Sequence, residues 1–290
     1  MKTPSTTVPA SAGAPAERRP ALLAPSLLGM LGLVLTALCL LMALFGPSLA
    51  PYDPAAIVDE EVFGAISSQF LLGTDYLGRD MLSRILVGAR FTVALALAAT
   101  LLASLTGTTL GLFAATAGGL VDATLSRALD ALISIPSKMF ALMMVASFGS
   151  SVPLLILTAA ISFMPGSYRI ARALAVNVQA MDFVQAARSR GEGMAYIMRV
   201  EILPNMIGPV LADFGLRFVF IVLLLSGLSF LSLGVQPPDA DWGSLVRENI
   251  AGLSEGAPAV LMPALAIALL TIGVNLLIDN LRGGRAGKEG

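Results

Sequence analysis

The sequence predicts an all-α membrane protein with six transmembrane helices. Hydrophobic residues make up 56% of the 290-residue chain and charged residues only 13%, with a mean hydropathy of +0.84. A soluble domain usually has about 25% charged residues. Several uncharged runs also reach the roughly 20 residues that a helix needs to cross a bilayer. From these runs we expect helices at about 26–46, 91–116, 123–148, 153–173, 204–233 and 258–281.

The first apolar run, 26–46, predicts a membrane anchor. Two arginines before it and a small-x-small sequence ending at Ala50 also resemble a secretory signal peptide with its cleavage site. The run is longer than the roughly 7–15 apolar residues of a signal peptide, which favours an uncleaved anchor. Residues 1–20 are rich in Pro, Ala, Ser and Thr and predict a disordered tail. Cys39 is the one cysteine, so an intrachain disulfide is excluded.

A connector precedes the second predicted span. Residues 72–90 have apolar side chains at helical spacing with polar side chains opposite, which predicts an amphipathic helix at the outer interface. Within the second span, Gly107 and Gly111 form a Gly-x-x-x-Gly pattern, which predicts close helix packing. The run 139–168 is too long for one helix, and we divide it at the Gly149 to Pro153 punctuation.

We therefore divide the chain into four parts. These are a disordered cytoplasmic tail (1–20), the first transmembrane helix with the extracytoplasmic loop and interfacial helix (21–90), a core of five transmembrane helices (91–281) and a cytoplasmic tail (282–290).

Four charged side chains fall inside the third and fifth predicted helices: Asp130, Lys138, Asp213 and Arg217. A charge at mid-bilayer costs about 2.5–3.5 kcal/mol or more unless it is paired or hydrated. Asp213 and Arg217 are four residues apart on one helix face and predict a local ion pair. Their matched depth also predicts pairs with Lys138 and Asp130 across the two helices. The alternative is that these side chains line a polar path through the membrane.

A polar segment separates the fourth and fifth spans. Residues 182–205 predict a short helix, a hinge at Gly191, a second amphipathic piece, and Pro204 opening the next apolar helix. Val184, Ala187 and, beyond the hinge, Met194, Ile197 and Met198 would give this segment an apolar face, which a solvated loop does not need. The pattern indicates a rigid cytoplasmic knob that a partner protein grips.

The loop after the fifth span, 234–247, predicts a stiff extracytoplasmic turn because Gln236 is followed by Pro237 and Pro238. We expect Trp242 to be an interfacial anchor. The loop is either a plain turn or a segment that meets the transport path or a partner.

The distribution of basic residues predicts the orientation. Lys and Arg outside the helices are concentrated on the side of both termini, and the opposite segments are rich in Asp and Glu. By the positive-inside rule, both termini are expected in the cytoplasm. Arg79, Arg84 and Arg90 run against this bias.

Missing residue types exclude most enzyme classes. The chain has no histidine, which excludes Ser-His hydrolases and histidine-ligated zinc or haem. The string nearest to a Walker A loop, Gly283 to Glu289, has the wrong spacing and ends in Glu where Ser or Thr is needed. The basic residues form no long run that would indicate nucleic-acid binding. We expect no catalytic residue, no metal and no cofactor in this chain.

Three motifs, in order, resemble a known family. The segment Phe183–Gly191 followed by Leu203-Pro204 resembles the EAA loop of ABC importer permeases, with Gln185 in place of its Glu. Leu72–Arg90 resembles the stretch before the second helix in the dipeptide/oligopeptide/nickel subfamily, and Leu228–Gly243 is similar to the loop after its fifth helix. Lys138 stands where an apolar residue is usual.

The resemblance implies a "C"-type permease subunit of a type I ABC importer in the inner membrane, with a cytoplasmic coupling helix. Its partners would be a second permease forming a heterodimer, two cytoplasmic ATPases that hold ATP and Mg, an extracytoplasmic substrate-binding protein, and membrane lipid. The residues implied to couple to an ATPase are Phe183, Val184, Gln185, Ala186, Ala187, Arg188, Gly191, Met194, Leu203 and Pro204.

The expected cargo is a di- or oligopeptide moved by alternating access, with nickel chelates or another small solute as alternatives. A rival class is a stand-alone proton-coupled transporter that uses Asp130 or Asp213. An intramembrane aspartyl protease with those two aspartates facing each other is a further rival, but no motif supports it.

Overall fold

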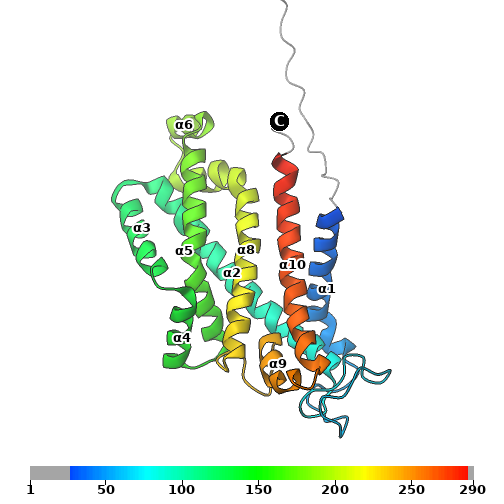
Figure 1. The fold of residues 1–290 in the computed structure, drawn as a ribbon. Coiled ribbons are helices and arrows are strands. Elements are labelled where there is room, and N and C mark those ends of the chain that lie inside the picture. Colours follow the sequence, from blue (N-terminus) through cyan, green and yellow to red (C-terminus); the bar gives the residue numbers. More distant parts are fainter. Residues whose placement is uncertain (1–26, 287–290) are drawn as a thin grey trace, which may run out of the picture.

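The structure is a bundle of long helices lying side by side (Figure 1). This computed structural model describes residues 27–286, with side chains as far as residue 280. Within these residues, five helices are long and apolar enough to cross a membrane, and a bent pair provides a sixth span when it is counted as one. The predicted six-helix architecture is confirmed. The predicted tail 1–20 lies outside the described residues, as does 287–290 of the second predicted tail.

The helices follow one another along the chain with short connections, except for the long segment before α2. In order they are α1 (Leu27–Leu49), α2 (Met81–Ala117), α3 (Gly119–Ile133), α4 (Ser137–Phe148), α5 (Val152–Gln179), α6 (Asp182–Ser189), α7 (Met194–Tyr196), a π-helix (Ile197–Ile202), α8 (Leu203–Phe230), α9 (Trp242–Glu248), a 3₁₀ turn (Ile250–Leu253) and α10 (Pro258–Ala286).

Helix α2 begins ten residues before the predicted start at 91, so the separate interfacial helix is wrong. Asp80 caps it, with its carboxylate accepting from the Ser83 amide at 2.8 Å and the Ser83 hydroxyl at 2.6 Å. Met81 and Ile85 are buried in the main core instead of facing an interface. Capping and burial together add these residues to the membrane helix.

The predicted close packing at the Gly-x-x-x-Gly pattern is confirmed, and the neighbour is α5. A Cβ on Gly107 would lie 2.7 Å from the Met164 carbonyl oxygen, and a Cβ on Gly111 would lie 2.8 Å from the Tyr168 carbonyl oxygen. Only a residue without a side chain allows the two backbones to approach so closely.

The third predicted span, 123–148, is not one helix. Helices α3 and α4 meet at an angle of 80°. Pro136 at the N-cap of α4 has an extended ψ of 128°, and proline disfavours helical geometry in the residue before it. The break therefore leaves the N-terminus of α4 between the two ends of the bundle (Figure 1).

Pro204 lies in the first turn of α8, as predicted, but α8 continues directly from the helical residues before it. A continuous helical run covers Met194–Phe230, and residues Ile197–Ile202 within it are π-helical. Proline has no N–H to donate to the carbonyl four residues earlier. The amide of Leu203 donates to Met198, five residues back, so the wider turn lets the helix pass through the proline.

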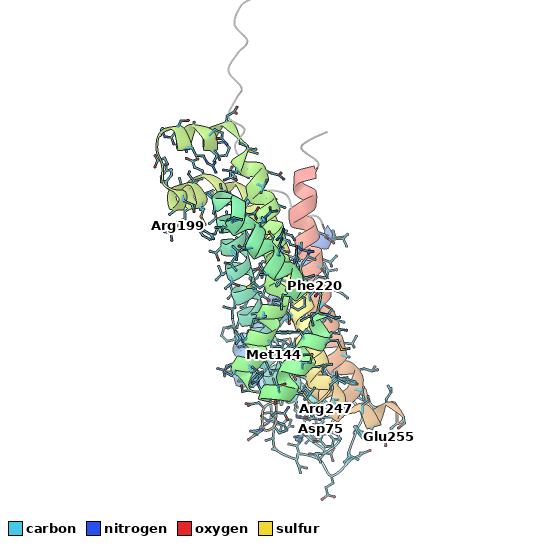
Figure 2. The ribbon with its side chains drawn as sticks, turned by 90° about the vertical axis from the view of Figure 1, so that its left-hand side faces the viewer. Asp75, Met144, Arg199, Phe220, Arg247 and Glu255 are labelled. Atoms are coloured by element: carbon cyan, nitrogen blue, oxygen red, sulfur yellow. The ribbon has the colours of Figure 1, made fainter. Side chains whose placement is uncertain are left out.

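Three apolar clusters hold the described part of the bundle together. The largest joins α1, α2, α4, α5, α8, α9 and α10. The smaller cluster joins α2, α5, α6, the π-helix and α8, and a third joins α2, α3 and α5. Figure 2 shows that Arg199 lies at the end of the molecule near α6, while Asp75, Arg247 and Glu255 lie at the opposite end near α9. Met144 of α4 and Phe220 of α8 lie between these ends.

Candidate coupling segment and transport path

Helix α6 stands at one end of the bundle and is anchored by its apolar side chains (Figure 1). Val184 and Ala187 are 0% exposed, and Val184 packs in the smaller cluster with Val178 and Ile202. The predicted outward apolar face is therefore wrong for these two residues and for Ile197, which is also buried, while Met194 is exposed as predicted. With only eight residues, α6 needs tertiary packing to be stable, and its apolar stripe is used for that purpose.

The outward side of the segment carries Met194 of the predicted apolar face together with Phe183. Phe183 is 38% exposed and Met194 is 42% exposed. Ala186 and Arg188 are exposed as well. These four residues are the exposed part of the candidate coupling segment, and we call them the exposed coupling surface. The alternation of buried and exposed positions in one short helix fixes which side a partner can reach.

Polar contacts fix both ends of the segment. The Gln185 side-chain amide donates to the Gln179 carbonyl oxygen at 3.0 Å, which ties α6 to the end of α5. A carboxylate has no proton to donate in this position, so glutamine makes a contact that an ionised glutamate cannot. Arg190 pairs with Glu201 of the π-helix at 3.6 Å. Gly191 has a φ of 83°, which confirms the predicted glycine turn.

The predicted ion pair of α8 is confirmed. Arg217 Nη2 lies 3.1 Å from Asp213 Oδ1, and the Ser167 hydroxyl of α5 donates to Asp213 Oδ2 at 2.9 Å. The predicted pairs with Lys138 and Asp130 across helices three and five are wrong. Asp130 pairs with Arg169 of α5 at 2.6 Å. Because α3 and α4 are bent by 80°, residues that would lie at matched depth on one straight helix are not brought together.

Helices α3 and α5 share a charged face that the sequence did not reveal. Asp130 and Arg169 have side chains 53% and 56% exposed, and Arg172 of α5 forms a second pair with Asp122 of α3. Exposed charges on membrane helices face water or protein and not lipid. The sequence signal is present in Arg169 and Arg172, which lie at helical spacing, but the charge-bias argument assigns them to the cytoplasmic segments.

Lys138 has no ion-pair partner within the part of the chain that the structure describes. It lines a cavity of about 240 Å³ between α4 and the last turns of α8. The other lining residues are Leu142, Leu223, Leu224, Gly227, Leu228, Phe230 and Leu231.

The end of the molecule near α9 holds a buried ion network that was also missed. Arg84 Nη1 lies 2.6 Å from Asp75 Oδ2 and 2.9 Å from Glu248 Oε2, and Arg79 Nε lies 2.7 Å from Asp75 Oδ2. Asp75 also accepts from the amides of Leu77 and Arg79. Arg79 and Arg84 run against the charge bias of the chain, and the two carboxylates account for them.

Trp242 is 0% exposed, so the prediction of an interfacial anchor is wrong. Its indole donates to the Ile85 carbonyl at 3.0 Å, and its amide donates to the Thr92 hydroxyl at 3.0 Å. The tryptophan therefore fastens α9 to α2. Asp241 caps α9 in a capping box with Ser244.

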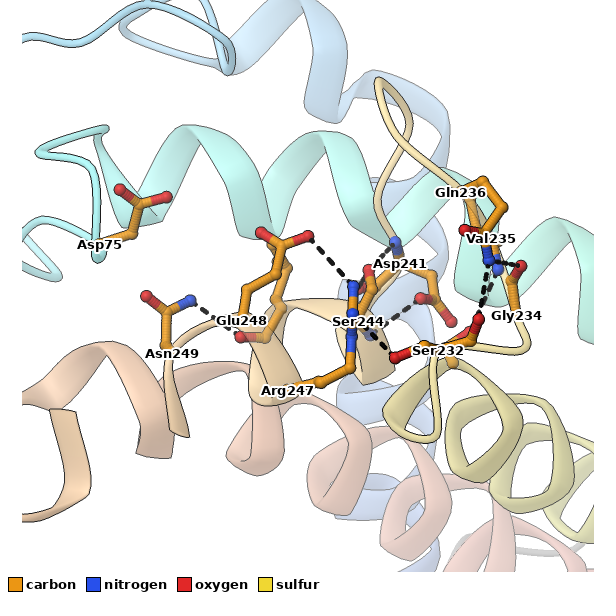
Figure 3. Close-up of polar contacts among 12 residues, drawn as sticks. Asp75, Ser232, Gly234, Val235, Gln236, Asp241, Ser244, Arg247, Glu248 and Asn249 are labelled. Atoms are coloured by element: carbon orange, nitrogen blue, oxygen red, sulfur yellow. Dashed lines mark hydrogen bonds and ion pairs between the residues drawn. The ribbon is translucent and has the colours of Figure 1, made fainter. Parts of the chain in front are cut away.

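The rest of the loop is close to the ion network. Gln236 is held on its own loop by the carbonyls of Ser232 and Gly234, and Arg247 donates to the Ser232 hydroxyl (Figure 3). Pro237 and Pro238 line a cavity of about 230 Å³ together with Arg79, Arg84 and Glu248. This part of the loop folds back onto α2 and is more than a plain turn.

Among the described residues, no group of Cys, Asp or Glu side chains is placed to hold a metal ion.

A polytopic membrane protein with a helical knob at one end and charged faces between its helices has the features of a transport subunit. Residues 107–284 match the family described as binding-protein-dependent transport system inner membrane component, and residues 26–69 match the N-terminal TM domain of oligopeptide transport permease C. The chain belongs to this family of ABC importer permeases, which are non-catalytic transport components of the inner membrane.

Two relatives cover nearly the whole chain. The di/tripeptide transport system permease protein DppC of Pseudomonas aeruginosa (strain UCBPP-PA14) is 33% identical over 257 residues, which are 87% of this chain and 85% of the relative. The glutathione transport system permease protein GsiD of Escherichia coli O1:K1 / APEC is 33% identical over 256 residues, 88% of this chain and 84% of the relative. A crystal structure of an amino acid ABC transporter with histidines aligns with a TM-score of 0.45 at 20% identity, covering 71% of this chain and 93% of that chain.

Proposed function

We propose that this permease moves di- or oligopeptides into the cell by alternating access, driven by ATP that partner ATPases hydrolyse with Mg. The chain would form half of the path, and a second, non-identical permease the other half. An extracytoplasmic binding protein would deliver the peptide. The names of the two relatives support this cargo, because both refer to peptides.

The observation that carries the proposal is the way in which α6 is attached to the bundle. The helix is fastened to the bundle by buried Val184 and Ala187 and by the Gln185 contact, while Phe183 and Met194 remain outside. A helix fixed in this way transmits the movement of a partner to the membrane helices instead of bending away from it. Closure of the ATPases would pull α6 and rock this half of the transporter against the other.

The same observation supports an orientation. ATPases and ATP are in the cytoplasm, so α6 and both chain termini would be cytoplasmic. The loop before α2, the ion network and α9 would then be extracytoplasmic.

The rival of a stand-alone proton-coupled transporter is less well supported by the geometry. Asp130 and Asp213, the two aspartates it would use, are both engaged by arginines.

Reconstitution tests the proposal. We expect no peptide uptake by this chain alone in liposomes with a proton gradient, and ATP-dependent uptake once the second permease, the ATPases and the binding protein are present. Uptake by the chain alone would contradict the proposal and support the proton-coupled class. Purification of the tagged chain in mild detergent should also recover the second permease and two ATPases.

A further inference from the structure

The cavity between α4 and α8 combines a single cation with apolar walls. Lys138 is the one charged residue among those lining it, and the other seven are leucine, phenylalanine or glycine. Gly227 has open space where a Cβ would project, so the cavity remains open beside the lysine.

The charges of the surrounding helices do not satisfy Lys138. Asp130 pairs with Arg169, and Asp213 pairs with Arg217 and accepts from Ser167. No described acidic side chain forms an ion pair with Lys138. An unpaired ammonium inside a membrane span is costly unless water or an anion reaches it.

The position of Lys138 on its helix adds a second, independent positive feature. It is the second residue of α4, and the N-terminus of α4 has no side-chain cap. The first amides of a helix carry a partial positive charge that disfavours a lysine and attracts an anion. The lysine therefore costs α4 stability, and an anion placed there would interact favourably with both groups.

The 80° break leaves this N-terminus exposed on one side of the bundle, away from both of its ends. Helix α4 begins between the α6 end and the α9 end, next to α5 and α8 (Figure 1). Transporters that bind anionic groups within the membrane use the N-termini of broken helices in the same physical way. Met144 and Phe220 in Figure 2 show that both helices lie in this middle region.

We infer that Lys138 and the N-terminus of α4 bind the terminal carboxylate of the transported peptide, while the leucines of α8 contact an apolar side chain next to it. This inference rests on the proposed peptide transport and names the group on the peptide that the permease recognises. The occupant follows from charge complementarity, because a carboxylate is the anionic group of a peptide chain and apolar walls suit its last side chain.

The test compares two probes, L-alanyl-L-phenylalanine and its C-terminal amide, in liposomes that contain the complete transporter with its binding protein. Uptake of both is measured for wild type, Lys138→Met and Lys138→Arg. Preferences of the binding protein are the same for every variant, so they cancel when the ratio of the two uptakes is compared between variants.

We expect Lys138→Met to lower uptake of the free dipeptide by about 10-fold or more, because a charge-assisted hydrogen bond is lost. Uptake of the amide should change by less than about 2-fold, and Lys138→Arg should retain most of the preference. Arg127→Met is the matched control, because it removes a cation from the same broken helix pair at a residue that does not line the cavity. It should leave the ratio unchanged.

Three results would overturn the inference. Equal losses of uptake for the dipeptide and its amide in Lys138→Met would show that Lys138 binds no carboxylate. An unchanged ratio of the two uptakes would show the same. Loss of the second permease from the purified Lys138→Met complex would show that an acidic group of that subunit pairs with the lysine. Failure of the proposed function itself is a separate result, because wild type would then take up neither probe with ATP.

Discussion

Arg84 of α2 and Glu248 of α9 form an ion pair of 2.9 Å between Nη1 and Oε2, in a network where Asp75 is fully buried. This contact joins the start of the second membrane span to the loop helix after the fifth. Arg79 reaches the same two carboxylates, so the two acids share two arginines. The network fixes the segment before α2 against α9.

Replacing Arg84 by methionine should destabilise the protein by about 3–5 kcal/mol, because buried Asp75 loses the closer of its cations. Thermal unfolding of the purified permease in detergent measures this. Arg90→Met is the control, because Arg90 is an exposed arginine of the same helix, and it should change stability by no more than about 0.5 kcal/mol. Similar melting curves for the two variants would show that the network adds little.

Gly107→Ala should destabilise the contact between α2 and α5 by about 1–3 kcal/mol, because the new Cβ would lie 2.7 Å from a backbone oxygen. Gly227→Ala has no atom within 4 Å of the new Cβ and is the matched control. A helix favours alanine over glycine, so the control should be neutral or slightly stabilising. If the two variants have the same melting temperature, α2 and α5 move apart easily enough to accept the methyl group.

The sequence predicted well those features that depend on local composition. Uncharged length predicted the spans, glycine spacing predicted close packing at Gly107 and Gly111, and a spacing of four predicted the Asp213–Arg217 pair. These features need no knowledge of the direction in which a distant helix lies.

Features that depend on the course of the chain in space were not predictable in this way. The 80° bend at Pro136 assigns Asp130 to Arg169 and leaves Lys138 without a partner among the described residues. The sequence predicted correctly that α6 is amphipathic, but it did not predict which side of α6 is buried. Periodicity shows that a helix has an apolar face and does not show what that face packs against. The residue type of Trp242 predicted a position at the membrane interface, yet its side chain is buried against α2.

The two faces of α6 predict two different kinds of defect. Val184→Ser should destabilise the permease, because a fully buried apolar side chain is replaced by a hydroxyl. Phe183→Ser changes an exposed residue, so melting should remain within about 0.5 kcal/mol of wild type, while ATPase binding and uptake fall by about 10-fold, as for an aromatic anchor of an interface. Co-purification of the ATPases and thermal unfolding separate the two effects. Wild-type uptake by Phe183→Ser would contradict the proposal that an ATPase binds the exposed coupling surface.

Asp241, the N-cap of α9, should make stability depend on pH. Burial raises the pKa of its carboxyl above the ordinary value, and hydrogen bonds from Ser244 and Ser229 oppose this. The folded state then binds a proton more tightly than the unfolded state, so stability should fall as pH rises from the ordinary aspartate pKa through the raised one.

The substitution Asp241→Asn would keep a side-chain oxygen that accepts from the Ser244 amide and would remove the ionisable group. The melting temperature of Asp241→Asn should therefore exceed that of wild type by an amount that grows across this pH window. A constant difference between Asp241→Asn and wild type at all pH values would mean that the buried carboxyl does not titrate in this window.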